Sequence, residues 1–232
     1  MKNILVSFSG GLDSTYLVYK NLKEGNKVKL CFSIIENNTN KTIVEKFCAR
    51  KLYEEFLKEF PQQIQSSFDF NTKVLINDYV GGLKFKQILI WLFSLIYHCE
   101  KETDKVHIGI TLNDDINPYR KDIKRIWKSF KPFYNGKLPK IKFPIYKKQK
   151  YEIEEDLPTN YKKFITFCEN PHIIYEDNLE VKFENCGECD SCRRYNYLNM
   201  IHIGYGQINS NFKTLEEPLN EKIDNNQLSL NF

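Results

Sequence analysis

The sequence predicts an α/β fold, in which a doubly wound parallel sheet is followed by a C-terminal module that four cysteines tie to a metal ion. Strand-length apolar runs alternate with stretches of helical periodicity over the first 130 residues, which is typical of parallel βαβ units. A Gly-Gly turn follows the first run, and a Cys-x-x-Cys-x-x-Cys pattern stands at residues 186–192. With 41% hydrophobic and 28% charged residues, the chain has the composition of a globular protein.

The expected strands and helices follow one another in alternation. The first strand, residues 4–8, is apolar and rich in β-branched residues, and it ends at a glycine turn. From Asp13 the apolar positions have helical spacing as far as Gly25, and a second helical pattern is stopped by Pro61. That second helix is expected at residues 41–60. Three further strands are expected at residues 28–35, 72–76 and 105–111, and two further helices at residues 83–99 and 118–130.

The pattern changes after residue 131, where prolines punctuate short segments and most of the cysteines follow. We therefore divide the chain into an α/β domain at residues 1–135, a C-terminal segment with the metal site at residues 136–206, and a polar, Asn-rich tail at residues 207–232.

Charge and hydropathy exclude several classes of protein. The 34 basic and 30 acidic side chains give a net charge of +4, which argues against a dedicated nucleic-acid binder. The N-terminus lacks the pattern of a signal peptide, and the longest apolar stretch, residues 88–97, is about half of the ~20 residues that cross a bilayer. We expect a cytoplasmic protein with no membrane contact, in which reduced thiols serve metal binding or catalysis.

The glycine turn predicts a phosphate-binding loop. Two glycines let the backbone turn tightly at the end of a strand, and the N–H groups at the start of the next helix attract anions. The spacing fits neither a Walker loop nor a dinucleotide fingerprint, and an ordinary turn with Asp13 and Ser14 as helix caps is the alternative. The residues expected around the phosphates are Ser9, Gly10, Gly11, Leu12, Asp13, Ser14 and Thr15.

The cysteine cluster predicts a metal site. The thiolates of Cys186, Cys189 and Cys192, completed by Cys168, suit a tetrahedral Zn²⁺ with four sulfur ligands and no open position for substrate. An iron–sulfur cluster is the alternative, because the spacing alone does not exclude it. None of the four histidines has the spacing of a catalytic or ligand pair, and His107 is expected to be a packing residue.

Residues 9–14 resemble the pyrophosphate loop (PP-loop) of the ATP-pyrophosphatase superfamily, and the loop and cysteine pattern together resemble the 7-cyano-7-deazaguanine synthase family, called QueC. The resemblance extends over about residues 4–200 and includes Gly109, Asp114, Lys150-Tyr151-Glu152-Ile153 and Thr166-Phe167-Cys168. It implies that ATP, with Mg²⁺, adenylates the carboxylate of a deazaguanine acid, that ammonia then attacks to give an amide and finally a nitrile, and that the protein is a homodimer.

The resemblance also implies roles for individual residues. Asp13, Ser14 and Lys150 are expected to be catalytic, with Lys150 neutralising charge during adenylation unless it is one more solvated lysine. Asp114 and Arg120 are expected to contact the substrate, although Asp114 would equally suit a Mg²⁺ ion or a solvated turn.

Three family elements that would recognise the substrate are altered here. Residues 36–39 replace a Gln-Arg-His element, residues 81–86 replace Pro-x-Arg-Asn, and Asn117-Pro118-Tyr119-Arg120 is a reduced Tyr-Pro-Asp-Cys-Arg. An offshoot that joins the acid to an amine on a protein or nucleic acid, in phage defence, is therefore an alternative. A zinc ribbon that binds RNA and a tRNA sulfur transferase are weaker alternatives, because the charge is near neutral and the clustered thiols are expected to hold metal.

Overall fold

A computed structural model describes residues 1–36, 38–65, 72–75, 86–176 and 180–197 of the chain. Five strands form one sheet in the order β3-β2-β1-β4-β5, and every neighbouring pair is parallel. Their bounds are β1 Asn3–Phe8, β2 Lys27–Glu36, β3 Thr72–Leu75, β4 Lys105–Ile108 and β5 Lys140–Lys142. The chain moves outward from β1 to β3 and then returns to the other side of β1, so the order of the strands reverses between β1 and β4.

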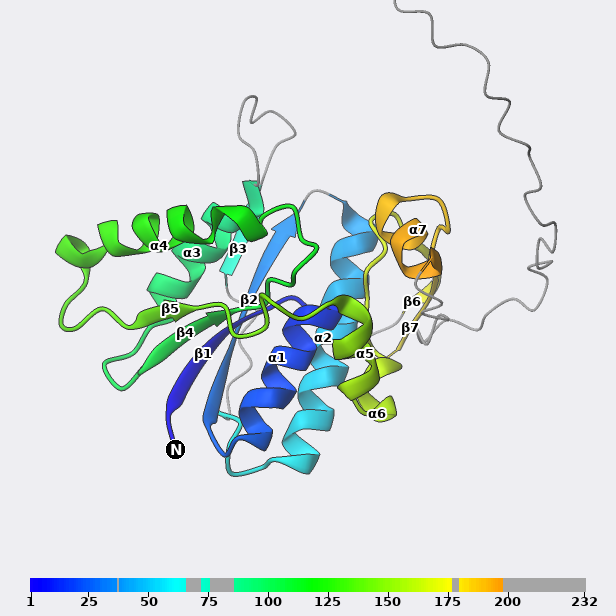
Figure 1. The fold of residues 1–232 in the computed structure, drawn as a ribbon. Coiled ribbons are helices and arrows are strands. Elements are labelled where there is room, and N and C mark those ends of the chain that lie inside the picture. Colours follow the sequence, from blue (N-terminus) through cyan, green and yellow to red (C-terminus); the bar gives the residue numbers. More distant parts are fainter. Residues whose placement is uncertain (37, 66–71, 76–85, 177–179, 198–232) are drawn as a thin grey trace, which may run out of the picture.

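Helices cover both faces of this sheet (Figure 1). One face shares its core with α1, α2, α5 and α6, and the opposite face shares its core with α3 and α4. The long helices are α1 Leu12–Lys23, α2 Thr39–Glu59, α3 Lys86–His98 and α4 Arg120–Ser129; the short ones are α5 Lys150–Asp156 and α6 Thr159–Lys162, with 3-10 turns at η1 Asn117–Tyr119 and η2 Lys131–Phe133.

The central strand, β1, contributes side chains to the cores on both faces of the sheet. Side chains alternate along a strand, so Val6 and Phe8 pack among α1 and α2, while Leu5 points to the core under α3 and α4. Because both faces are buried, the middle of β1, Ile4-Leu5-Val6, is a continuous apolar run rather than an alternating one.

The C-terminal segment folds back on α2. A hairpin of β6 His172–Glu176 and β7 Val181–Glu184 is followed by α7 Asp190–Tyr197. Val181 and Phe183 of β7 pack on Val44 and Cys48 of α2. The backbone N–H of Thr166 donates to the Gly10 carbonyl over 3.3 Å, so the chain that leads into this module also contacts the glycine turn.

The predicted doubly wound parallel α/β fold is confirmed. One detail of the sequence interpretation is wrong: regular α/β structure does not stop near residue 131, because β5 extends the sheet beyond residue 135. The division into domains stays a prediction, and the polar tail at 207–232 lies outside the described residues. Among the described residues, no helix has the length and apolar character of a membrane span.

Candidate active site and metal centre

The glycine turn lies between β1 and α1, where the strand order reverses. Gly10 has a φ of +76°, a left-handed backbone conformation that glycine adopts without the steric cost of a side chain. Ser14 fixes the turn from inside: its hydroxyl donates to the Gly11 carbonyl over 3.1 Å and accepts from the Ser9 N–H over 3.2 Å. The turn therefore holds the N-terminus of α1 against the end of β1, in the arrangement that suits an anion.

The chain that leaves β4 runs directly beside this turn. A Cβ atom on Gly109 would lie 3.0 Å from the Asp13 carbonyl carbon and 3.1 Å from its oxygen. These are backbone atoms, which give way less easily than a flexible side chain, so any larger residue would have to push the two segments apart by a few tenths of an ångström. Close packing therefore favours glycine at Gly109, which the family resemblance singles out.

Lys150 joins two carboxylates that are distant in sequence. Its ammonium lies 3.0 Å from Asp13 Oδ2 and 3.3 Å from Asp114 Oδ1. The other oxygen of Asp114 accepts hydrogen bonds from the backbone N–H and the hydroxyl of Thr111, at 2.6 and 2.9 Å. Asp13, Asp114 and Lys150, which were predicted as site residues separately, therefore form one cluster beside the turn.

Asp13 is the most perturbed member of this cluster. Burial raises its pKa to about 6, the Lys150 charge opposes that rise, and the nearby Asp114 carboxylate adds to it. Asp13 Oδ1 is buried and has no hydrogen-bond partner. An oxygen of this kind is an available hard ligand for Mg²⁺, which prefers carboxylates together with phosphate oxygens and water.

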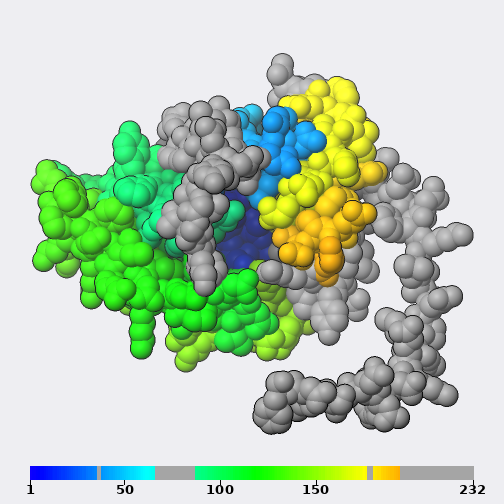
Figure 2. All heavy atoms as spheres, turned by 90° about the horizontal axis from the view of Figure 1, so that it is seen from above, coloured from blue at the N-terminus to red at the C-terminus, as the bar shows by residue number. Residues whose placement is uncertain are grey.

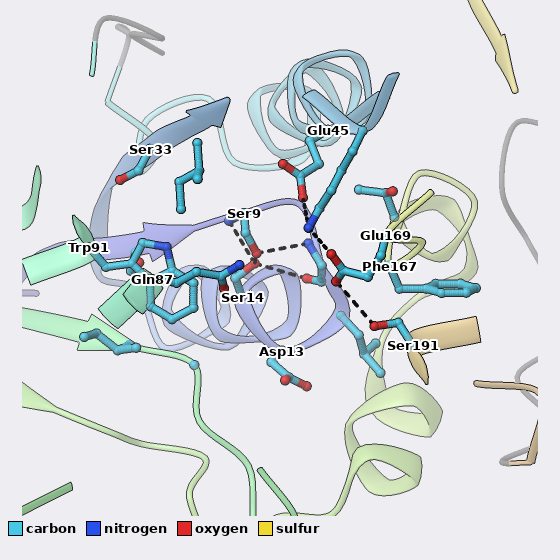
Figure 3. Close-up of a pocket in the computed structure, with 18 of the residues that line it drawn as sticks. Ser9, Asp13, Ser14, Ser33, Glu45, Gln87, Trp91, Phe167, Glu169 and Ser191 are labelled. Carbon is cyan, nitrogen blue, oxygen red and sulfur yellow. Dashed lines mark hydrogen bonds and ion pairs between the residues drawn. The ribbon is translucent and has the colours of Figure 1, made fainter. Parts of the chain in front are cut away.

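A cavity of about 230 Å³ opens above the glycine turn. Figure 2 shows the dark blue N-terminal residues at the bottom of a hollow, with α2 in light blue and the orange module beside it. In Figure 3, Trp91 and Gln87 lie on one side of Ser9 and Ser14, and Glu169 and Ser191 on the other. The cavity thus lies between an α3 wall and a wall that includes the cysteine module.

A buried lysine stands between two acids in that second wall. Lys41 is 8% exposed; its ammonium pairs with Glu169 and lies 3.8 Å from Glu45 Oε1. Burial raises the Glu45 pKa to about 7, while the charge of Lys41 opposes the rise. Ser191 Oγ lies 3.5 Å from Glu169 Oε1, so this polar group reaches the metal module (Figure 3).

The four predicted metal ligands lie together. The sulfur atoms of Cys168, Cys186, Cys189 and Cys192 are all within 4.8 Å of one another. Backbone N–H groups point at these sulfurs: Cys186 N donates to Cys168, Cys189 N to Cys186, and Cys192 N to Cys189, over 3.2 to 3.4 Å. Such donors stabilise thiolates, so the donor set suits a soft metal ion.

Arg120 lies away from the glycine-turn cavity. Its guanidinium stacks 4.2 Å from the centre of the Tyr146 ring and donates to the Asn117 carbonyl. Its predicted contact with the substrate of this cavity stays a prediction. Phe167, from a segment that the family resemblance includes, lines the cavity. The sequence interpretation missed several other side chains that line it, because no spacing singles them out: Lys41, Glu45, Gln87, Trp91, Glu169 and Ser191.

Comparison with known proteins gives one family. The model of the family described as "Queuosine biosynthesis protein QueC" matches residues 3–202. No curated protein sequence matches the chain. Among solved structures, it is similar to the U34-tRNA thiolase NcsA from Methanococcus maripaludis with its [4Fe-4S] cluster, with 17% sequence identity and a TM-score of 0.43. The match covers 66% of this chain and 55% of the thiolase, so this chain spans about half of the thiolase's length.

Two substitutions should move the Asp13 pKa in opposite directions. Lys150→Met removes the ammonium that opposes the rise, so the pKa should exceed its present value of about 6. Asp114→Asn removes a like charge, so the pKa should fall. Carbon-13 NMR of the side-chain carboxyls measures both shifts, and Lys147→Met, whose exposed ammonium lies over the Tyr146 ring, is the control that should leave the Asp13 pKa unchanged.

The same raised pKa affects stability. Because the folded-state pKa of about 6 exceeds the usual 3.8, ionisation of Asp13 costs folding energy. Its contribution to the free energy of unfolding should fall as the pH rises between these two values and then level off. If Lys150→Met and Asp114→Asn moved the Asp13 pKa in the same direction, this electrostatic description of the cluster would be contradicted.

Proposed function

Because this chain belongs to the QueC family, we propose that it uses ATP to adenylate the carboxylate of a 7-deazaguanine acid and then joins the activated carbon to nitrogen. The observation that carries the proposal is the cluster of Asp13, Lys150 and Asp114 beside the glycine turn. It supplies a fixed cation and hard oxygen ligands at a turn shaped for phosphate, which are the parts that phosphoryl chemistry requires.

The glycine turn would hold the phosphates of ATP. The N–H groups at the start of α1 and the positive end of its dipole favour phosphate oxygens, and Gly10 lets the backbone approach them without a Cβ atom. Ser9 and Ser14 hydroxyls, 3.2 Å apart, lie at the floor of the cavity. Mg²⁺, when bound through Asp13 and Asp114, would neutralise charge on the phosphates, and Lys150 would add a cation on the same side.

The proposed reaction consists of adenylation of the acid, formation of the amide, and a second adenylation that leads to the nitrile. A carboxylate oxygen of the acid attacks the α-phosphorus of ATP, the bond to the bridging β-oxygen breaks, and pyrophosphate leaves. Ammonia then attacks the carbonyl carbon, the bond to AMP breaks, and the nitrogen loses a proton to give the amide. The amide oxygen then attacks the α-phosphorus of a second ATP and releases pyrophosphate, and loss of AMP with the remaining nitrogen-bound protons leaves the nitrile. Both adenylations need positive charge at the α-phosphate, which the Lys150 ammonium would supply.

The walls of the cavity suit a planar purine-like acid. Trp91 provides an aromatic surface on one side. The carboxylates of Glu45 and Glu169 on the other side are acceptors for the N–H groups of a guanine-type edge, and Lys41 keeps these acids in place. We propose that these residues recognise the substrate in place of the altered family elements. Residues 37 and 81–85, which belong to two of those elements, lie outside the described residues.

We propose zinc for the four cysteines. A tetrahedral Zn²⁺ with bonds of about 2.3 Å sets neighbouring sulfurs about 3.8 Å apart. The sulfurs of Cys168 and Cys186 are 3.5 Å apart, and those of Cys186 and Cys192 are 4.0 Å apart. In a four-iron cluster each thiolate binds a different iron, which spreads the sulfurs further. The metal would have a structural role, since four protein ligands leave no open position.

Zinc content tests the metal proposal. The purified protein should carry one zinc per chain by mass spectrometry, and Cys189→Ser should lose it and unfold the hairpin, because in such sites metal binding supplies folding free energy. Cys99→Ser, which changes a cysteine outside the cluster, should keep the zinc. Iron with visible absorbance, or full zinc in Cys189→Ser, would overturn the assignment.

Turnover tests the proposed function. With ATP, 7-carboxy-7-deazaguanine and ammonia, the protein should release AMP and pyrophosphate, and Lys150→Met should lower kcat/KM at least 100-fold, or about 2.7 kcal/mol. Lys150→Arg keeps the charge and should restore part of the rate, whereas Lys147→Met should behave like the wild type. Zinc content confirms that each variant is folded.

The products separate the two versions of the proposal. Free amide or nitrile supports the base-forming reaction, and a mass increase on an added protein or nucleic acid supports transfer to a macromolecular amine. Release of ADP in place of AMP would rule out adenylation, and no reaction with the acid would rule out both versions.

A further inference from the structure

A second cavity, of about 600 Å³, lies at the β4–β5 end of the sheet. It shares no lining residue with the cavity above the glycine turn. It is lined by residues of the second half of α1, of the two strands, and of the start of α4. Of these residues, only Arg120 has an expected role in the adenylation, as a predicted substrate contact, and it lies away from the glycine-turn cavity.

Basic side chains dominate this cavity. Six of the residues that line it are cationic: Lys20, Lys105, Arg120, Lys121, Lys124 and Lys142. Glu24 is the one acid among the lining residues, and its carboxylate pairs with Lys20 over 2.6 Å. The cavity therefore has a large positive excess in a protein whose net charge is only +4.

The register of the two strands places these charges. His107 of β4 pairs with Lys142 of β5. The residues before them, Val106 and Ile141, point into the core under α3 and α4. Because side chains alternate along a strand, His107 and Lys142 point to the opposite face, beside the second half of α1.

His107 gives an independent indication of a ligand. It is 7% exposed and lines the cavity, and its Nδ1 has no hydrogen-bond partner. Burial lowers its pKa to about 4, with the neighbouring Lys105 charge in the same direction, so the imidazole is neutral near pH 7. A buried ring nitrogen without a partner is costly, and a ligand polar atom in the cavity would relieve that cost.

Lys20 is paired with Glu24, whereas Lys105 is crowded by other cations. Contact with Lys2 lowers the pKa of Lys105, and partial burial and the charge of Lys142 act in the same direction. Crowded cations that depress one another's protonation are stabilised by an anion placed between them. The neutral imidazole and the ammonium groups together fit the oxygens of phosphate.

We propose that this cavity is a second binding site, which takes a compact ligand bearing a chain of phosphates. A cavity of this size encloses a small molecule, whereas single-stranded nucleic acid needs a groove with aromatic faces for its bases. The ring of Tyr146 is already covered by the Arg120 guanidinium. The phosphates could belong to a nucleotide or to inorganic oligophosphate, which share this chemistry.

Histidine NMR reports on this cavity separately from the cavity above the glycine turn, which has no histidine among its lining residues. The chain has four histidines, so ¹⁵N-histidine labelling gives few signals, and His107→Gln assigns the one in the cavity. Inorganic triphosphate should shift the His107 signal saturably, even when the same ligand also fills the glycine-turn cavity. Lys105→Ala with Lys142→Ala should weaken this binding at least tenfold, and Lys128→Ala, an exposed lysine of α4 that does not line the cavity, should not.

Separate titrations with ATP and with inorganic triphosphate identify the source of the phosphates. A stronger response to ATP than to triphosphate identifies a nucleotide, and an equal response identifies the phosphate chain; both support the site. No saturable shift at millimolar triphosphate, or equal affinity in the double variant, would overturn it. A shift produced by single-stranded RNA at lower concentration than by triphosphate would show a nucleic-acid surface instead. None of these outcomes depends on turnover.

Discussion

The arrangement of the active site depends on the ammonium of Lys150 between two carboxylates. Asp13 belongs to the turn before α1, Asp114 to the chain that follows β4, and Lys150 to the start of α5. The segments of Asp13 and Asp114 come together because β1 and β4 are neighbours in the sheet, and α5 reaches them because it shares its core with α1. A half-buried cation between two acids is costly to break, because its removal leaves two like charges facing each other.

The module with the four clustered cysteines belongs to the same site. Residues 166–169 run from the glycine turn to the first cysteine: Thr166 N–H donates to Gly10, Cys168 is one of the clustered thiols, and Glu169 pairs with Lys41 in the cavity wall. The N–H of Glu169 also donates to the sulfur of Cys189 over 3.4 Å. A structural metal would therefore position the part of the wall that faces the substrate, as ligands of this kind order the loops around them.

Local patterns predicted most of the fold and the chemistry. The glycine turn and the cysteine cluster are short motifs whose spacing carries its own physical reason. β5 could not be predicted, because a strand of three residues shows no periodicity. In the structure, a hydrogen bond from the Trp127 indole N–H to the Pro139 carbonyl, over 2.8 Å, links α4 to the residue that precedes β5. His107 was expected to be a packing residue, and it is buried, but the cationic cavity around it arises from pairing between strands that the sequence does not show. Lys41 and Glu45 were not predicted as cavity residues for a similar reason. They line the cavity from α2, whose neighbouring residues Val44 and Cys48 belong to the core.

Transfer of an oxygen atom tests the central claim most directly. If the carboxylate attacks the α-phosphorus of ATP, acid labelled with ¹⁸O in its carboxylate should pass one ¹⁸O to the phosphate of the AMP released with the amide. Mass spectrometry of that AMP measures the transfer in a single turnover. Labelled AMP is the predicted result. AMP with no label, formed while the amide accumulates, would contradict adenylation of the acid and with it the role given to the cluster around Lys150.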